Sequence, residues 1–128
     1  MKYKKTILYV DDSPNQLKLM KANLEDCNIQ CYTANNGLEG FNAYIEKNKE
    51  LNMILTDIQM PMWDGFDLLN HVRLIETMEK HNKIRIVSLS GSYEESAYYI
   101  GLGFDKHLTK PASIETILEE IYRKWQLQ

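Results

Sequence analysis

Cysteine is scarce in this sequence, and the two that occur fit neither a disulfide framework nor a metal site. Cys27 and Cys31 are separated by three residues, and no further cysteine or histidine lies nearby to complete a set of metal ligands. We therefore expect both thiols to be reduced, which is typical of a cytoplasmic protein.

Long apolar runs and an excess of positive charge are also absent. The apolar residues 7–10 follow three lysines but end at Asp11 and Asp12, so they do not form a secretion signal. No apolar run approaches the roughly 18 residues that a membrane span needs. The 15 Lys and Arg against 18 Asp and Glu give a formal charge of −3, so the overall charge does not indicate binding to nucleic acid or to an anionic membrane.

The residues that are present are typical of one globular domain. The chain has 128 residues, of which 44% are hydrophobic and 26% are charged. No linker, low-complexity segment or block of like charge divides it. We expect residues 1–128 to form a single domain, with no length left for a second.

Five short apolar runs alternate along the chain with segments of helical spacing. The runs cover residues 6–10, 29–34, 53–56, 84–89 and 104–108. Ser13 with Gln16, and Ser92 with Glu95, match the capping box that opens a helix, and Ser113 is predicted to cap the last helix. Strands that alternate with helices predict a parallel sheet covered on both faces, which is a doubly wound α/β fold.

Polar side chains follow four of the five predicted strands. Asp11 and Asp12 follow the first strand, Asp57 the third, Ser90 the fourth and Lys110 the fifth. Ligands of open α/β sheets bind beyond the carboxyl ends of the strands. We therefore expect these side chains to converge on one edge of the sheet.

Three carboxylates at one edge repel one another, and this repulsion favours a bound cation. Magnesium prefers oxygen ligands in octahedral geometry, and no cysteine or histidine accompanies the acids, so Mg²⁺ fits better than zinc or calcium. The alternative is that Asp11 and Asp12 only end a strand and cap a helix.

Four segments of the chain resemble the signature blocks of one known family. They are residues 7–13 with the pair Asp11-Asp12, residues 55–65 with the pattern Asp-x-x-Met-Pro-x-x-Asp-Gly, residues 87–91 with a hydroxyl at Ser90, and residues 108–111 with Lys110-Pro111. Together and in this order they resemble the response regulator receiver domain of two-component signalling. The resemblance implies a flavodoxin-like sheet of strand order 2-1-3-4-5. A receiver would fill the 128 residues and leave none for an output domain, so the chain is expected to be either a single-domain regulator or a receiver excised from a larger protein.

The resemblance also implies a phosphoryl acceptor and its metal ligands. Asp57 would accept a phosphoryl group from a phosphohistidine on a histidine kinase or a histidine phosphotransferase. Mg²⁺, or Mn²⁺ in its place, would be held directly by Asp12, Asp57 and the backbone carbonyl of Gln59, whereas Asp11 would act mainly through bound water. The chain would lose the phosphoryl group by its own hydrolysis and would not be a turnover enzyme.

Further residues are implied to bind the phosphoryl group and to transmit its presence. Lys110 and Ser90 would contact the phosphoryl oxygens, and the bond before Pro111 would be a cis peptide. His107 stands where the family has an inward-turning Tyr or Phe. It is either the switch residue or a partly exposed strand histidine without that role.

The resemblance implies a signal passed by protein contacts. A downstream protein would bind the face formed by the fourth helix, fifth strand and fifth helix, and the chain would be a monomer or a weak dimer that binds neither nucleic acid nor membrane. Trp63 is either a docking contact for the phosphodonor or a cover for the site. His71 and His81 are expected to be solvated, and Gly65 is expected to serve a positive φ or close packing.

Other classes fit the residues less well. A haloacid-dehalogenase-type phosphatase needs an Asp-x-Asp pair, but Asp11 and Asp12 are adjacent and Gln59 stands two residues after Asp57. A flavodoxin-type binder would offer a hydroxyl- and glycine-rich loop to phosphate where this chain has two acids. A receiver-like binding module that acts without phosphorylation is the remaining alternative.

Overall fold

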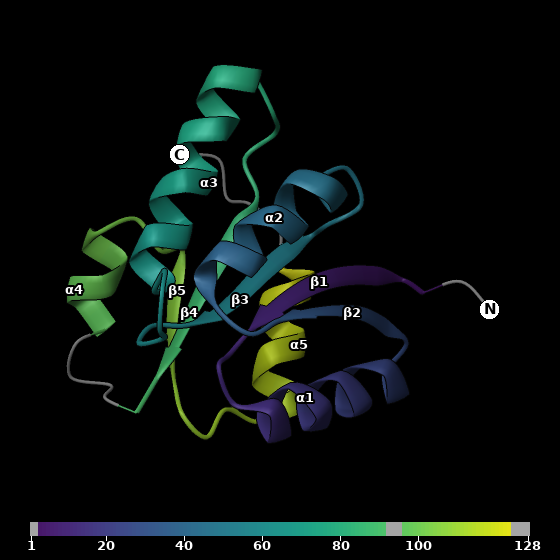
Figure 1. The fold of residues 1–128 in the computed structure, drawn as a ribbon. Coiled ribbons are helices and arrows are strands. Elements are labelled where there is room, and N and C mark those ends of the chain that lie inside the picture. The colour runs from purple at the N-terminus through teal and green to yellow at the C-terminus, as the bar shows by residue number, and fades with distance from the viewer. Residues whose placement is uncertain (1–2, 92–95, 124–128) are drawn as a thin grey trace.

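A five-stranded parallel sheet forms the centre of the computed structural model, which describes residues 3–91 and 96–123 (Figure 1). Its strands lie in the order β2-β1-β3-β4-β5, and every neighbouring pair is parallel. They are β1 (Lys5–Val10), β2 (Ile29–Ala34), β3 (Met53–Asp57), β4 (Arg85–Ser90) and β5 (Lys106–Thr109). The predicted doubly wound fold and its strand order are confirmed.

The helices cover both faces of the sheet (Figure 1). They are α1 (Pro14–Asp26), α2 (Gly37–Lys47), α3 (Gly65–Glu79), α4 (Ser96–Gly101) and α5 (Ile114–Tyr122). Alternate strand residues point to opposite faces, so β1 sends Leu8 into the core beneath α2 and α3 and Tyr9 into the core beneath α1 and α5. Both cores are closed by apolar side chains from these helices, so both faces of the sheet are buried.

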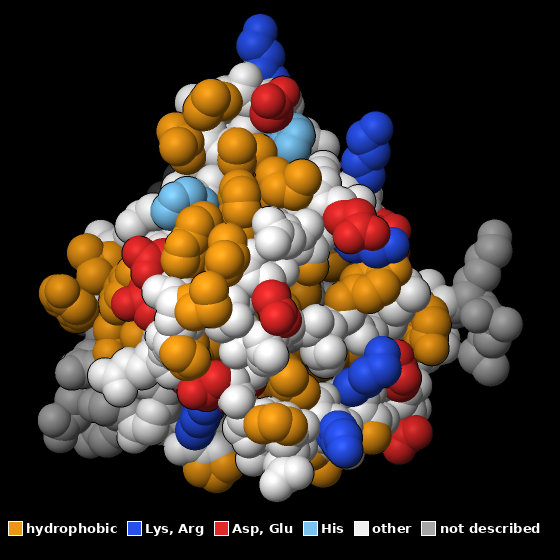
Figure 2. Space-filling view, viewed as in Figure 1, with side chains coloured by type: hydrophobic (Ala, Val, Ile, Leu, Met, Phe, Trp, Pro, Cys, Tyr) orange, Lys and Arg blue, Asp and Glu red, His pale blue; other side chains and the backbone are white. Residues whose placement is uncertain are grey.

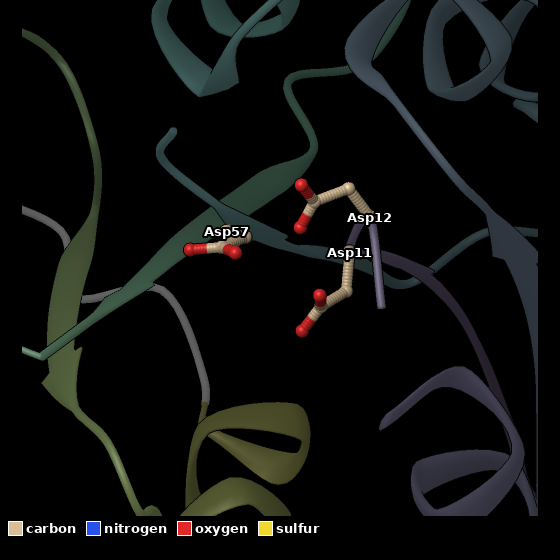
Figure 3. Close-up of side chains that lie close together, drawn as sticks. All are labelled: Asp11, Asp12 and Asp57. Atoms are coloured by element: carbon tan, nitrogen blue, oxygen red, sulfur yellow. The ribbon is translucent and has the colours of Figure 1, made fainter. Parts of the chain in front are cut away.

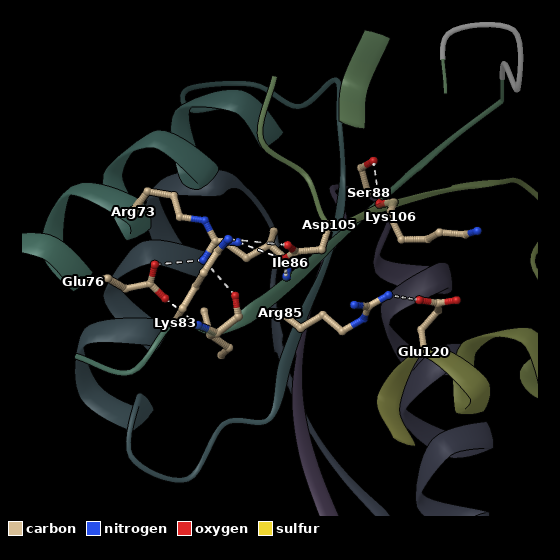
Figure 4. A network of polar contacts seen from close by, with 10 residues as sticks. Arg73, Glu76, Lys83, Arg85, Ile86, Ser88, Asp105, Lys106 and Glu120 are labelled. Carbon is tan, nitrogen blue, oxygen red and sulfur yellow. Dashed lines mark hydrogen bonds and ion pairs between the residues drawn. The ribbon is translucent and has the colours of Figure 1, made fainter. Parts of the chain in front are cut away.

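Two groups of largely buried charges fasten helices to the sheet (Figure 4). Arg73 of α3 contacts Glu76 at 2.8 Å and Asp105 at 2.9 Å, and the Asp105 carboxylate also accepts the backbone N–H of β4 residue Ile86. On the other face, Arg85 of β4 pairs with Glu120 of α5. Breaking such pairs by removing one partner leaves a buried charge without its counterion, so they hold these elements in place.

The helix starts follow from local side-chain chemistry. The hydroxyl of Ser13 accepts the N–H of Gln16 at 3.3 Å, and Ser113 likewise accepts the N–H of Thr116 at 3.1 Å, as predicted. The N–H of Ser13 donates to Asp11 at 2.9 Å, so an acid of the strand end completes this cap instead of Gln16. The predicted capping box of Ser92 and Glu95 lies outside the described residues.

Both cysteines are free thiols, with Cys27 exposed and Cys31 buried. Burial raises the pKa of Cys31 to about 12. Within residues 3–91 and 96–123, no helix combines the length and the apolar character that crossing a bilayer requires.

Candidate functional site

Three carboxylates meet where β1 and β3 end (Figure 3). Asp11 and Asp12 follow directly after β1, and Asp57 is the last residue of β3. Each contributes one oxygen to a group whose members all lie within 4.8 Å of one another. The convergence predicted from the strand ends is present for all three acids.

The two neighbouring acids differ in how much of their hydrogen-bonding capacity is used. Asp11 is 1% exposed and accepts the Tyr9 hydroxyl at 2.6 Å and the Ser13 N–H at 2.9 Å. Asp12 is exposed, and across the described ranges its carboxylate has no hydrogen bond or ion pair. Asp11 is therefore held by the protein, whereas the oxygens of Asp12 are available to a ligand.

Tyr9 is a site residue that the sequence analysis missed. Its burial, followed by its bond to Asp11, raises the pKa of the phenol, so it stays a hydrogen-bond donor. The sequence did contain a signal, because Tyr9 lies two residues before Asp11 and residues two apart on a strand point to the same face.

Asp57 is held between a backbone amide and a cation. Its Oδ1 accepts the N–H of Ile58 at 2.9 Å, and its Oδ2 lies 3.2 Å from Nζ of Lys110, which is also 3.5 Å from Asp11 Oδ2. Burial raises the pKa of Asp57, and the positive charge of Lys110 opposes that rise. One ammonium thus faces a group of three acids, which leaves the site short of positive charge.

The donor set suits a hard divalent cation. The three acids offer only oxygen, and this is the chemistry that Mg²⁺ prefers over softer metals. Gln59 lies two residues beyond Asp57 and is exposed, and the role of its carbonyl oxygen as a ligand stays a prediction.

Gly65, at the start of α3, packs directly on the backbone of the acid. A Cβ at this position would lie 2.5 Å from the carbonyl oxygen of Asp57, and the Gly65 N–H donates to the Ile58 carbonyl at 2.8 Å. Its φ is not positive, so close packing is the reason for glycine and the alternative of a positive φ is wrong. The loop is also tied to α2, where Gly37 donates its N–H to the Trp63 carbonyl at 2.8 Å.

Ser90 ends β4, and its hydroxyl lies against a buried histidine. Ser90 Oγ is 3.0 Å from Nε2 of His107, and the other ring nitrogen of His107 is 2.7 Å from Ser88 Oγ. His107 is 5% exposed, so the partial exposure expected in one interpretation is wrong, whereas its role as the switch residue stays a prediction. Ser88 was missed in the sequence, although a second hydroxyl two residues before Ser90 was a visible signal.

Lys110 follows directly after β5. Its backbone N–H donates to the Ser90 carbonyl at 2.7 Å, and its bond to Pro111 is cis. Beside it lies a cavity of about 480 Å³ between α1 and the start of α5. Its walls include Leu19, Met20 and Pro111, so an apolar surface borders the charged site.

Trp63, in the loop after β3, belongs to a row of rings between α2 and α3. It stacks on His71 at a centroid distance of 4.0 Å and lies 5.6 Å from Phe41. His81 accepts from or donates to the Tyr44 hydroxyl at 2.9 Å. His71 and His81 are half-buried, so the expectation that they are solvated holds only in part, and both roles of Trp63 stay predictions.

Exposed apolar side chains gather over the same helices (Figure 2). Ile45 of α2 and Leu74 and Met78 of α3 are each close to half exposed or more, and Met62 of the preceding loop is 73% exposed. A second exposed pair, Tyr98 and Ile100, lies on α4, whereas Tyr99 points into the core.

The chain is similar to known proteins over nearly its whole length. Residues 7–122 match the family model described as the response regulator receiver domain. The chain is 33% identical over 122 residues to hybrid signal transduction histidine kinase F of Dictyostelium discoideum, which covers 93% of the chain and 11% of that kinase. It spans about a tenth of the length of this and similar curated relatives.

Solved structures show the same architecture. A response regulator receiver domain protein from Clostridium thermocellum matches with a TM-score of 0.74 and 26% identity, over 91% of this chain and 90% of that one. The Saccharomyces cerevisiae complex of the phosphotransfer protein Ypd1 with the receiver domain of Ssk1 matches with a TM-score of 0.80 and 24% identity, over 94% of this chain and 88% of that one.

Proposed function

The chain belongs to the family of response regulator receiver domains, modules of two-component and phosphorelay signalling, and we propose that it accepts a phosphoryl group on Asp57 from a phosphohistidine. The observation that carries this proposal is the environment of Asp57. Its carboxylate lies 3.2 Å from Lys110 and within a group of three acids whose oxygens are all within 4.8 Å.

The acids would hold Mg²⁺, which neutralises charge on the phosphoryl group and aligns it with the attacking carboxylate. Asp12 and Asp57 are the direct ligands in this proposal, together with the carbonyl oxygen of Gln59. Asp11 would act through bound water, and the use of its oxygens by Tyr9 and Ser13 supports that indirect role.

The chain's own residues then hold the transferred group. Asp57 attacks through a carboxylate oxygen, and the bond between phosphorus and the donor imidazole nitrogen breaks as the bond to Asp57 forms. Lys110 already pairs with the Asp57 carboxylate, and it lies close enough to pair with the phosphoryl oxygens once the group is on Asp57. Ser90, at the end of the neighbouring strand, would donate its hydroxyl to one of those oxygens.

The phosphodonor would approach along the cavity between α1 and the start of α5. Leu19, Met20 and Pro111 line that cavity beside Lys110, so a protein that buries apolar side chains there brings its histidine to the charged site. The similar structure of Ypd1 with the Ssk1 receiver pairs a histidine phosphotransfer protein with a receiver domain. The downstream partner would bind around α4, where Tyr98 and Ile100 are exposed.

Intact-mass measurement tests the proposal. The chain, incubated with acetyl phosphate and Mg²⁺, should gain one phosphoryl group that hydroxylamine removes, as expected of an acyl phosphate. The Asp57→Asn variant should gain none, and Asp26→Asn, which alters an exposed acid at the end of α1, should behave as the unmodified chain. A phosphoryl group on another residue would overturn the assignment to Asp57. No phosphoryl group at all, even with a histidine phosphotransfer donor, would leave the phosphorylation-independent binding module as the better function.

A further inference from the structure

His107 is held on both sides by serines of the neighbouring strand. In the parallel pairing of β4 with β5, Ser88 lies opposite His107 and Ser90 opposite Thr109. The two serine hydroxyls therefore flank one imidazole, with Ser88 Oγ at 2.7 Å from Nδ1 and Ser90 Oγ at 3.0 Å from Nε2. The ring of Tyr99 from α4 covers the imidazole at a centroid distance of 4.6 Å.

The proton positions in this arrangement decide what Ser90 can do. A neutral imidazole carries one N–H and one lone pair, so one serine must donate to the ring and the other must accept from it. If Ser90 donates to Nε2, its only hydroxyl proton is used by His107. If Ser90 instead accepts from Nε2–H, its proton is left for another acceptor.

The acceptors around Ser88 favour the second arrangement. Ser88 Oγ lies 2.7 Å from His107 Nδ1 and 3.4 Å from the Lys106 carbonyl oxygen (Figure 4). If Nδ1 carried the ring proton and donated it to Ser88, the Ser88 hydroxyl would have only the 3.4 Å contact for its own proton among the described residues. Hydroxyl donors prefer contacts below about 3.0 Å, so the better arrangement has the Ser88 hydroxyl donating to an unprotonated Nδ1. The distance of 3.0 Å from Nε2 to Ser90 Oγ is an ordinary length for an N–H donor.

We infer that His107 is a fixed positioning residue that Ser88 holds as the Nε2–H tautomer. In this tautomer Nδ1 accepts from Ser88 and Nε2–H donates to Ser90. The hydroxyl proton of Ser90 is then directed to the phosphoryl group on Asp57. Only the last step, donation of the Ser90 proton to the phosphoryl group, rests on the proposed function. This imidazole differs from a ring that turns inward upon phosphorylation, because His107 is already buried and hydrogen-bonded at both nitrogens.

The path to α4 follows from the same contacts. A movement of Ser90 Oγ toward a phosphoryl group on Asp57 would change the length of its bond from Nε2, and that change acts on a ring in contact with Tyr99. Phosphorylation would therefore be sensed at α4 through a change in one hydrogen bond of a stationary imidazole.

Long-range ¹H–¹⁵N correlation spectra of the full chain read the tautomer directly. The His107 signals, assigned by their loss in His107→Phe, should show a protonated Nε2 and an unprotonated Nδ1, with and without beryllofluoride and Mg²⁺. In Ser88→Ala the pattern should become a mixture of tautomers, and Ser88→Thr, which keeps the hydroxyl, should restore it. A protonated Nδ1 in the unmodified chain would overturn the inference.

A double-mutant cycle tests the coupling to Ser90. Ser88→Ala should weaken beryllofluoride binding about two- to tenfold, the range expected for one hydrogen bond. Because Ser88 acts through Ser90, the double variant should bind no more weakly than Ser90→Ala alone, whereas a general loosening of the strand would add to it. Additive losses would overturn the inference.

The proposed function has its own readout in the same experiment. If the unmodified chain fails to bind beryllofluoride with Mg²⁺, the proposed function fails and delivery of the Ser90 proton fails with it. If the unmodified chain binds and Ser88→Ala binds equally well with an unchanged tautomer, only the inference is overturned.

Discussion

Adding one methyl group at Gly65 should disturb both the fold and the acceptor site. In Gly65→Ala the new Cβ would lie 2.5 Å from the Asp57 carbonyl oxygen and 3.1 Å from the Cα of Ile58. Ordinary contacts begin near 3.4 Å, so backbone must move by about 1 Å. The Asp57 carbonyl has little freedom, because it accepts the Thr56 hydroxyl at 2.8 Å at the end of a central strand.

Overpacking of this kind costs about 1 to 3 kcal/mol. For a domain of this size each kcal/mol lowers Tm by about 3 to 4 °C, so we expect a loss of roughly 3 to 12 °C. The Ile58 N–H binds Asp57 Oδ1, and its displacement should also slow phosphoryl uptake from acetyl phosphate. Differential scanning calorimetry and intact-mass time courses measure the two effects.

Gly91→Ala is the matched control, because a Cβ there meets no atom of the described residues within 4 Å. It makes the same chemical change near the same edge of the sheet and should leave Tm within about 1 °C of the unmodified chain. If Gly65→Ala were as stable as Gly91→Ala and took up the phosphoryl group as fast as the chain without substitutions, the close approach at Gly65 would not constrain Asp57.

Two further substitutions test the charges of the site. Burial raises the pKa of Asp57 above its value in the unfolded chain, so the carboxyl favours folding only while protonated, and that contribution is lost as pH rises through the folded pKa. Asp57→Asn should therefore raise Tm at pH 7, and the gain should shrink as pH falls toward 4; a gain independent of pH would contradict the burial argument. In Lys110→Met, Asp11 and Asp57 lose their shared cation, which should cost about 1 kcal/mol or less because the ammonium is partly exposed. Mg²⁺ should then raise Tm more than in the unmodified chain, since it no longer competes with Lys110; equal Mg²⁺ shifts would refute this.

The acidic site could be predicted because it depends on strand ends. Parallel strands place their carboxyl ends on one edge, so Asp11, Asp12 and Asp57 had to converge once the strands were located. The local caps at Ser13 and Ser113 were predictable for a similar reason, since each depends on residues within one turn.

Features set by distant contacts were not predictable in this way. The strand β5 begins at Lys106 instead of residue 104, because the N–H of Phe104 still donates to the Tyr99 carbonyl of α4. The burial of His107 depends on which hydroxyls the β4 register places beside it, and the stacking of His71 depends on where the loop places Trp63. Neither the burial of His107 nor the stacking of His71 can be predicted from the residue spacing within one segment.

The loop of residues 58–65 is held by contacts within the chain. Met62 adopts a left-handed φ of 67°, a conformation that disfavours a side-chain-bearing residue by about 1 to 2 kcal/mol. The bonds from Gly65 to Ile58 and from Gly37 to Trp63 hold it there. The conformational entropy of this loop is lost during folding, so a ligand bound at its edge retains more of its contact energy as affinity.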